Sequence, residues 1–246
     1  MRRLWRLLRV ILHILLGLLL ALVCDAFRAP YRPRVRRIVR WWLQYLLKVL
    51  AVRVRVQGQA PTAGHFLVSN HISWLDIPVL AAQADVYFLS KAEVRQWPLI
   101  GALAAAAGTL FIRRGGGESK QKAEEIAGHL RDGRNILLFP EGTTTDGSGV
   151  RRFFRQLFAA PVLADVPVQP VALRYPERQG ARPEREGPAD RDIAFINDDA
   201  FHIHLWRLLL RDEIVADVTF CTPLLPIGHT PGTLAQQCHT QISATL

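Results

Sequence analysis

The stretch FLVSNHISWLDIPVLAA, residues 66–82, contains the change of pattern that decides the fold. Its first four residues, 66–69, form a short run without polar alternation, which is typical of a strand buried on both faces. A polar turn over residues 70–76 follows, and residues 77–82 favour a helix. A buried strand that passes through a short turn into a helix is the repeating unit of α/β domains.

The same succession of strand and helix continues on both sides of this stretch. Residues 52–56 alternate between apolar and basic side chains with a period of two, as expected for an edge strand. Further short apolar runs predict buried strands at residues 86–89, 109–112, 136–139, 168–173 and 214–220. Helices are predicted at residues 77–82, 97–107, 119–131, 154–164 and 201–211, and a surface loop at residues 176–192. The pattern predicts an α/β fold with a largely parallel mixed sheet flanked by helices, preceded by an N-terminal membrane-anchoring helical segment.

The positive charge of the chain is concentrated near its N-terminus. The formal net charge is +10, but residues 1–56 contain 13 Lys and Arg against the single acidic residue Asp25. The other 190 residues contain 18 basic and 20 acidic side chains. A nucleic-acid-binding protein normally has its basic surface on the folded domain. Because the basic excess surrounds apolar helical sequence here, we expect a membrane with anionic lipid headgroups as the partner, and no nucleic acid.

The first apolar segment predicts a membrane anchor. Arginines at positions 2, 3, 6 and 9 precede the apolar run 10–24, and a helix over residues 4–27 is just long enough to span a bilayer. A signal peptide has a similar start, but Asp25 and the arginine-rich sequence after it favour an anchor that is retained. Since arginines flank the run on both sides, a full span and a shallow or re-entrant helix both remain open.

Residues 35–48 mix Arg and Lys with Trp, Tyr and Leu, which is typical of an interfacial amphipathic helix. An ordinary helix that packs on the core is the alternative interpretation. We therefore divide the chain into residues 1–50, an anchor with an interfacial helix, and residues 51–246, a catalytic domain. For localisation we expect the bacterial inner membrane, with the catalytic domain facing the cytoplasm.

The turn after the strand at 66–69 contains a histidine and an aspartate, His71 and Asp76, that can meet across the strand-to-helix junction. In such a pair the carboxylate holds one imidazole nitrogen and fixes the tautomer, which leaves the other nitrogen free to take a proton. By itself, a histidine near an aspartate is more often structural than catalytic. Two further motifs strengthen the catalytic interpretation.

The first of these motifs, residues 108–114, places Arg113 and Arg114 at the end of a predicted strand. Two guanidinium groups there can bind a phosphate or carboxylate bidentately, although alone they would more often be solvated. The second, Phe-Pro-Glu-Gly-Thr at residues 139–143, follows the next buried strand. It combines a rigid turn, the Glu141 carboxylate and backbone N–H groups, which suit a hydroxyl-rich or anionic headgroup.

In this order, the three motifs resemble those of the glycerolipid acyltransferases typified by 1-acylglycerol-3-phosphate acyltransferase. A fourth block, Val-Pro-Val-Gln-Pro-Val-Ala at residues 166–172, is similar to a segment of the same family. The resemblance covers about residues 64–175. It implies transfer of a fatty acyl chain from acyl-CoA or acyl carrier protein to the hydroxyl of a lysolipid in phospholipid biosynthesis, with no cofactor and no metal.

The resemblance also implies residue roles. His71 matches the general base and Asp76 its orienting partner. Arg114, with Arg113 beside it, matches the arginine that binds the phosphate of the acceptor. The substrate-binding motif over residues 141–143 comprises Glu141, Gly142 and Thr143.

The third motif departs from the family pattern. Relatives commonly continue it with Arg-Ser, whereas Thr144, Thr145 and Asp146 follow here. The missing arginine removes one cation from a phosphate-binding site. This continuation and residues 204–209, His-Leu-Trp-Arg-Leu-Leu, resemble the bacterial lyso-ornithine-lipid acyltransferase branch. An O-acyltransferase for lyso-ornithine lipid is therefore the alternative function.

Other function classes lack their motifs. A serine hydrolase is the rival enzyme, but Ser148 is one residue out of register with a Gly-x-Ser-x-Gly elbow. Glycines 115–117 lack the Gly-Lys-Ser/Thr end of a phosphate loop. His202 and His204 have the spacing of metal ligands without a third ligand nearby. The three scattered cysteines predict reduced thiols. A basic peripheral-membrane or nucleic-acid-binding protein, the non-enzyme rival, conflicts with the near-neutral body.

Overall fold

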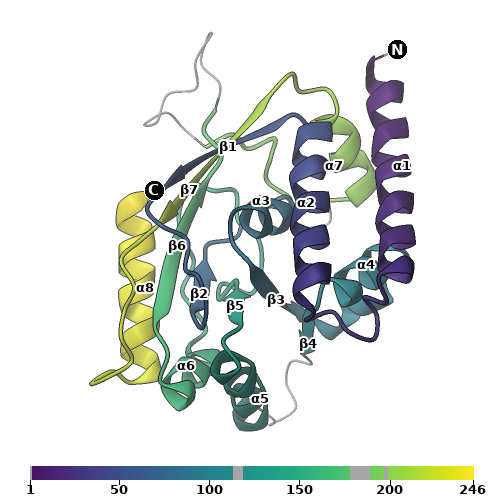
Figure 1. Cartoon of the computed structure of the whole chain (residues 1–246). Coiled ribbons are helices and arrows are strands. Elements are labelled where there is room, and N and C mark those ends of the chain that lie inside the picture. The colour runs from purple at the N-terminus through teal and green to yellow at the C-terminus, as the bar shows by residue number, and fades with distance from the viewer. Residues whose placement is uncertain (1, 113–118, 178–188, 197–198) are drawn as a thin grey trace.

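The computed structural model describes residues 2–112, 119–177, 189–196 and 199–246. They form a seven-stranded sheet with helices on both faces (Figure 1). The strand order is β1-β7-β6-β2-β5-β3-β4. Neighbouring strands are parallel except for the antiparallel pair β6 and β7. The predicted α/β fold with a largely parallel mixed sheet is confirmed, and so is the position of the first strand at an edge.

The elements follow one another along the chain much as the pattern predicts. The strands are β1 Val52–Gln57, β2 Phe66–Ser69, β3 Val86–Lys91, β4 Leu110–Ile112, β5 Asn135–Leu138, β6 Val168–Arg174 and β7 Ile214–Phe220. The helices are α1 Arg2–Val23, α2 Pro33–Val49, α3 Asp76–Gln83, α4 Ile100–Ala106, α5 Ser119–Arg131, α6 Ala159–Ala164, α7 Phe201–Leu208 and α8 Pro231–Thr245. Two short 3-10 helices, η1 Ala92–Gln96 and η2 Arg155–Phe158, precede α4 and α6.

Both faces of the central strands are buried, which explains why their sequences do not alternate. In β2, Leu67 packs into the core on the face covered by α2 and α3. Its neighbours Phe66 and Val68 pack into the core on the opposite face, with α5 and α8. Figure 1 shows α8 on one side of the sheet and α1, α2 and α3 on the other. Successive side chains of these strands are all apolar because a core lies on each face of the sheet.

Three predicted helices differ from their expected bounds. The helix predicted over residues 97–107 begins only at Ile100, because Pro98 has no N–H to donate and Leu99 has a φ of 62°. The helix predicted over residues 154–164 consists of η2 followed by α6. The helix predicted over residues 201–211 ends at Leu208. By contrast, α5 has the predicted bounds.

The sequence pattern did not predict α8, which covers the face of the sheet opposite α1, α2 and α3 (Figure 1). Its apolar face is narrow and its mean hydropathy is low, so its periodicity is weak. Thr230 nevertheless caps the helix through a reciprocal pair of hydrogen bonds with Thr233, and Pro231 occupies the first turn. A capping threonine followed by proline is a start signal that could have revealed the helix.

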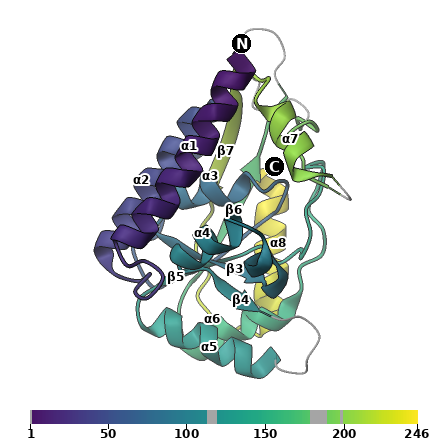
Figure 2. The ribbon, with the colours of Figure 1, turned by 90° about the vertical axis from the view of Figure 1, so that its right-hand side faces the viewer.

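Helix α1 ends at Val23, short of the predicted residue 27, because Asp25 adopts a φ of 54°. Among the described residues it is the one helix long and apolar enough to cross a membrane. Val10, His13, Gly17 and Ala21 face the rest of the molecule, and a row of leucines faces outward. Figure 2 shows α1 lying along α2 on the outside of the molecule. With this exposed apolar face, the chain is membrane-associated.

A ring stack with two close polar contacts joins α1 to α2. The rings of His13 and Trp42 stack with centroids 4.5 Å apart. Trp42 Nε1 donates to the carbonyl of His13 at 2.9 Å, and His13 Nε2 lies 3.0 Å from the carbonyl oxygen of Trp42. Gly17 leaves room for the indole, since a Cβ there would lie 2.7 Å from Trp42 Nε1.

Helix α2 has one face in the core and one face exposed. Leu47 and Val49 are buried in the same core as the sheet, whereas Trp41 and Tyr45 are exposed. The helix thus has the predicted amphipathic pattern and also packs on the core, as the alternative interpretation expected. A division of the chain at residues 50 and 51 stays a prediction, and Leu50 lies fully inside this shared core.

Candidate active site

The predicted catalytic turn lies at the carboxyl edge of the sheet. Residues 70–75 connect β2 to α3, and Glu141 belongs to the loop after β5. Because β2 and β5 are parallel neighbours, both loops leave the sheet at the same edge. Ligands of α/β proteins gather at this edge. The topology therefore brings two predicted motifs, 70 residues apart in the chain, side by side.

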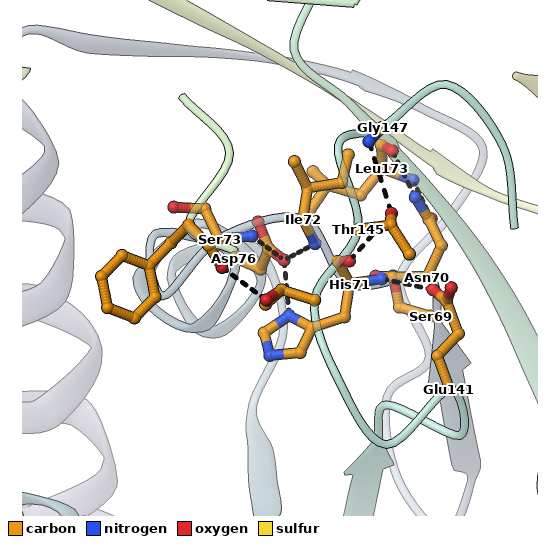
Figure 3. Close-up of polar contacts among 12 residues, drawn as sticks. Ser69, Asn70, His71, Ile72, Ser73, Asp76, Glu141, Thr145, Gly147 and Leu173 are labelled. Atoms are coloured by element: carbon orange, nitrogen blue, oxygen red, sulfur yellow. Dashed lines mark hydrogen bonds and ion pairs between the residues drawn. The ribbon is translucent and has the colours of Figure 1, made fainter. Parts of the chain in front are cut away.

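His71 and Asp76 form a hydrogen-bonded pair (Figure 3). His71 Nδ1 lies 2.7 Å from Asp76 Oδ2, which also accepts the backbone N–H groups of Ile72 at 2.7 Å and Ser73 at 3.0 Å. The Asp76 side chain is fully buried, and that of His71 is 18% exposed. Because Oδ2 already acts as an acceptor for two backbone N–H groups, His71 donates its Nδ1–H to it and Nε2 is left as an acceptor. The pair has the geometry of a general base with its orienting carboxylate.

A neighbouring ring fixes the imidazole plane. Phe139 stacks on His71 with centroids 3.9 Å apart and an angle of 12° between the planes. Phe139 stands directly after β5, at the start of the loop that contains Glu141. The carboxylate and the aromatic ring together leave the imidazole little freedom to rotate.

Glu141 holds the backbone of both loops in place. Its side chain is buried, and Oε1 accepts the N–H of His71 while Oε2 accepts the N–H of Arg151, both at 2.8 Å. Burial raises the pKa of Glu141, and the two N–H groups partly offset this effect. Each carboxylate oxygen thus has a backbone donor. A direct contact of Glu141 with an acceptor substrate stays a prediction.

A large apolar cavity begins beside His71. Its volume is about 910 Å³, and Gly142, Thr143 and Thr144 line it together with His71. Side chains from α1, α2, α3, α4 and β3 form much of the remaining wall. This volume lies within the usual range of small-molecule sites, and the lining suits an alkyl chain. Of the predicted binding residues, Gly142 and Thr143 therefore line the same cavity as His71.

Arg113 and Arg114 lie outside the described residues. They follow β4, whose last residue, Ile112, lines the cavity. Their predicted contact with an acidic headgroup stays a prediction.

Two residues of the site were not predicted from the sequence. Tyr175, just after β6, donates its hydroxyl hydrogen bond to Asp76 Oδ1 at 2.8 Å. Phe195 donates its N–H to the carbonyl of Ile72 at 2.9 Å, and its own carbonyl accepts a hydrogen bond from Thr144. Phe195 also lines the cavity. No motif marks either residue, because each reaches the site from a distant part of the chain.

His204 has a structural partner in the catalytic turn. Its Nδ1 accepts a hydrogen bond from Trp74 Nε1 at 3.0 Å, and its ring is buried. In the described part of the chain, no group of three or more His, Cys, Asp or Glu side chains is placed to hold a metal ion.

An α/β fold with a histidine–aspartate pair whose histidine lines an apolar cavity suits an enzyme that moves an acyl group. Residues 51–174 match the family described as Acyltransferase. The chain therefore belongs to the acyltransferase family, which confirms the resemblance seen in the motifs.

Three known proteins show how the chain compares with relatives. It is 44% identical to a lyso-ornithine lipid O-acyltransferase of Pseudomonas aeruginosa, over 89% of this chain and 81% of that protein. It is 32% identical to a 1-acyl-sn-glycerol-3-phosphate acyltransferase of Neisseria gonorrhoeae, over 71% of this chain and 66% of the relative. Its fold matches the crystal structure of the 1-acyl-sn-glycerophosphate (LPA) acyltransferase PlsC from Thermotoga maritima. In that comparison the TM-score is 0.64 at 19% identity, over 97% of this chain and 95% of that one.

Proposed function

We propose that this enzyme transfers a fatty acyl chain from a thioester, acyl-CoA or acyl carrier protein, to the hydroxyl of a lysolipid. The observation that supports this function is the His71–Asp76 pair, whose histidine lines the apolar cavity. The pair supplies a base for a hydroxyl proton, and the cavity accepts a fatty chain. Membership of the family supports the reaction class.

His71 accepts and returns one proton in the proposed reaction. Its Nε2 takes the proton of the lysolipid hydroxyl as that oxygen attacks the thioester carbonyl carbon. The imidazolium formed is stabilised by the Asp76 carboxylate on the opposite nitrogen. When the tetrahedral intermediate collapses, the C–O ester bond remains and the C–S bond breaks. The leaving thiolate takes the proton back, so the enzyme returns to its starting state without a covalent intermediate.

Two lysolipids are proposed as acceptors. Sequence motifs placed 1-acyl-sn-glycerol-3-phosphate first and lyso-ornithine lipid as the alternative, and relatives named for each acceptor match the chain. The higher identity, 44% against 32%, leads us to test lyso-ornithine lipid first. The deciding experiment offers both lysolipids side by side with acyl-CoA and with acyl carrier protein, and measures kcat/KM for each pair.

Substitution of Thr144 should change the preference between the two acceptors. Its hydroxyl donates a hydrogen bond to the carbonyl of Phe195, and both residues line the cavity. An arginine at position 144 adds a cation that pairs with a phosphate monoester. If lyso-ornithine lipid is the natural acceptor, Thr144→Arg should shift the kcat/KM ratio toward 1-acyl-sn-glycerol-3-phosphate by about tenfold. Arg114→Ala should shift it the opposite way if Arg114 binds the phosphate. A ratio that stays constant in both variants would show that neither residue recognises the headgroup.

We further propose that the membrane is the bacterial inner membrane and that the catalytic domain faces the cytoplasm. Bacterial relatives support the organism class. The arginines of residues 28–40 support the cytoplasmic side, because anionic lipids attract basic segments there.

The outward face of α1 should be the main membrane contact. Replacing Leu8, Leu12, Leu15 and Leu19 together by asparagine leaves the core untouched, because all four side chains are exposed. We expect this variant to lose most of its binding to phosphatidylethanolamine–phosphatidylglycerol vesicles in a flotation assay. As a matched control, Leu225→Asn with Ile227→Asn removes exposed apolar surface elsewhere and should float like wild type. Equal flotation of the α1 variant and wild type would contradict the anchor interpretation.

A further inference from the structure

Asp76 is fully buried, and each of its two oxygens has its own donors. Oδ2 accepts His71 Nδ1 and two backbone N–H groups from the catalytic turn. Oδ1 accepts the hydroxyl of Tyr175 at 2.8 Å, the one side chain among the described residues that donates to it. Tyr175 is 1% exposed and follows the last residue of β6. The Tyr175 hydroxyl is thus placed to act on Asp76, in addition to the packing of its ring in the core.

We propose that Tyr175 is a positioning residue, whose hydroxyl holds Asp76 in the orientation in which Asp76 supports His71. This inference rests on the proposed function of the dyad. Three donors on one carboxylate oxygen fix one end of the group. The Tyr175 hydroxyl fixes the other end, so that the carboxylate cannot rotate away from the imidazole. The tyrosine touches neither substrate nor reacting atoms and acts through Asp76.

The same hydrogen bond tunes how strongly Asp76 attracts the proton of His71. A donor on Oδ1 withdraws charge from the carboxylate. Without it, Oδ1 would be a buried oxygen with no donor, and more negative charge would face the imidazole through Oδ2. The imidazolium would then be favoured. Burial raises the pKa of Tyr175 well above its usual value, so the phenol stays protonated and keeps donating throughout the working pH range.

A further titratable group, Glu141, lies beside the dyad. Glu141 approaches from the loop after β5, and its charge acts on both His71 and Asp76. Because Glu141 is present in wild type and variants alike, a difference between them reports on Tyr175.

The test is the pH profile of kcat/KM for the full-length Tyr175→Phe enzyme, with acyl-CoA and whichever lysolipid the wild type uses. The acid limb of this profile reports protonation of the base in the free enzyme. A favoured imidazolium loses activity earlier as the pH falls, so the limb should move up by about half a unit to one unit. We expect kcat at neutral pH to fall about tenfold, because a carboxylate fixed at one end only holds the imidazole less firmly in its working orientation, while KM stays within twofold. Tyr87→Phe, a buried tyrosine on the opposite face of the sheet, should change neither quantity.

A double-mutant cycle separates action through Asp76 from a general packing role. If Tyr175 acts through Asp76, adding Tyr175→Phe to Asp76→Asn should lower kcat by less than twofold further. Additive losses in the cycle, or a Tyr175→Phe enzyme with an unshifted acid limb, would overturn the inference.

Fluorotyrosine placed at position 175 provides a second measurement that does not depend on the phenylalanine variant folding. The ring keeps its shape and its hydroxyl becomes a stronger donor, so the acid limb should move down by a few tenths of a unit. An unmoved limb would count against the proposal. If wild type transfers no acyl group, or if His71→Ala is fully active, the proposed function fails. If those two results are as expected and Tyr175→Phe behaves like wild type, the positioning role alone fails.

Discussion

The His71→Ala enzyme should turn over about a hundred to ten thousand times more slowly than wild type, the usual contribution of a general base. The imidazole acts mainly in the transition state, so kcat should fall far more than KM changes. The fold should persist, because the bond to Glu141 comes from the backbone N–H of residue 71 and survives the substitution. Turnover would be measured on purified protein, together with the thermal melting temperature.

His65→Ala is a suitable control for this variant. His65 stands just before β2, at the opposite end of the strand from the catalytic turn, and its Nδ1 lies 2.8 Å from the carbonyl oxygen of Ala63. The control should have wild-type turnover. Near-normal turnover of a folded His71→Ala enzyme would show that His71 is not the general base.

The Asp76→Asn enzyme should lose about a hundred- to a thousandfold in turnover. The backbone N–H groups of Ile72 and Ser73 both point at Oδ2, so the asparagine should place its carbonyl oxygen there and its NH₂ group toward Tyr175. His71 would then keep its Nδ1 proton. The enzyme should escape the roughly ten-thousandfold loss that a wrong tautomer causes in a serine protease triad. What it loses is the negative charge that stabilises the imidazolium.

The pH profile of Asp76→Asn should show the loss of this charge. Without the carboxylate, the imidazolium is less favoured, so the acid limb of kcat/KM should move to lower pH. This direction is opposite to that expected for Tyr175→Phe. The carboxylate charge is absent whichever tautomer forms, so the size of the loss distinguishes the two, and a loss near ten-thousandfold would indicate the wrong tautomer.

The sheet was predictable from sequence where a short strand is buried on both faces. Phe66–Ser69 has the predicted bounds. Successive residues of a strand point to opposite faces of the sheet, so an uninterrupted apolar run indicates that both faces are buried. The break at Pro98 and Leu99 was not found, although the proline marked it, because the surrounding residues are all apolar or small. The helix Pro231–Thr245 was missed because its apolar stripe is narrow and its start signal is confined to a few residues.

The residues of the site also differ in how far the sequence predicted them. His71 and Asp76 were predictable because they meet within one local turn, where sequence spacing determines distance. Tyr175 was not, because its partner Asp76 stands 99 residues earlier, at the start of α3, and the contact depends on the pairing of β2 with β6. The Glu141 motif was found, but the contacts of its carboxylate with two backbone N–H groups depend on how the loops fold.

The most direct test of the account is mass spectrometry of the product formed by the purified full-length chain. The enzyme would be mixed with isotope-labelled acyl-CoA or acyl carrier protein and with lyso-ornithine lipid or 1-acyl-sn-glycerol-3-phosphate in detergent micelles. We predict a labelled, doubly acylated lipid with the new ester on the free hydroxyl, formed by wild type and nearly absent with His71→Ala. Release of labelled free fatty acid without acylated lipid, or labelling of a serine by a fluorophosphonate, would identify a hydrolase and contradict the account.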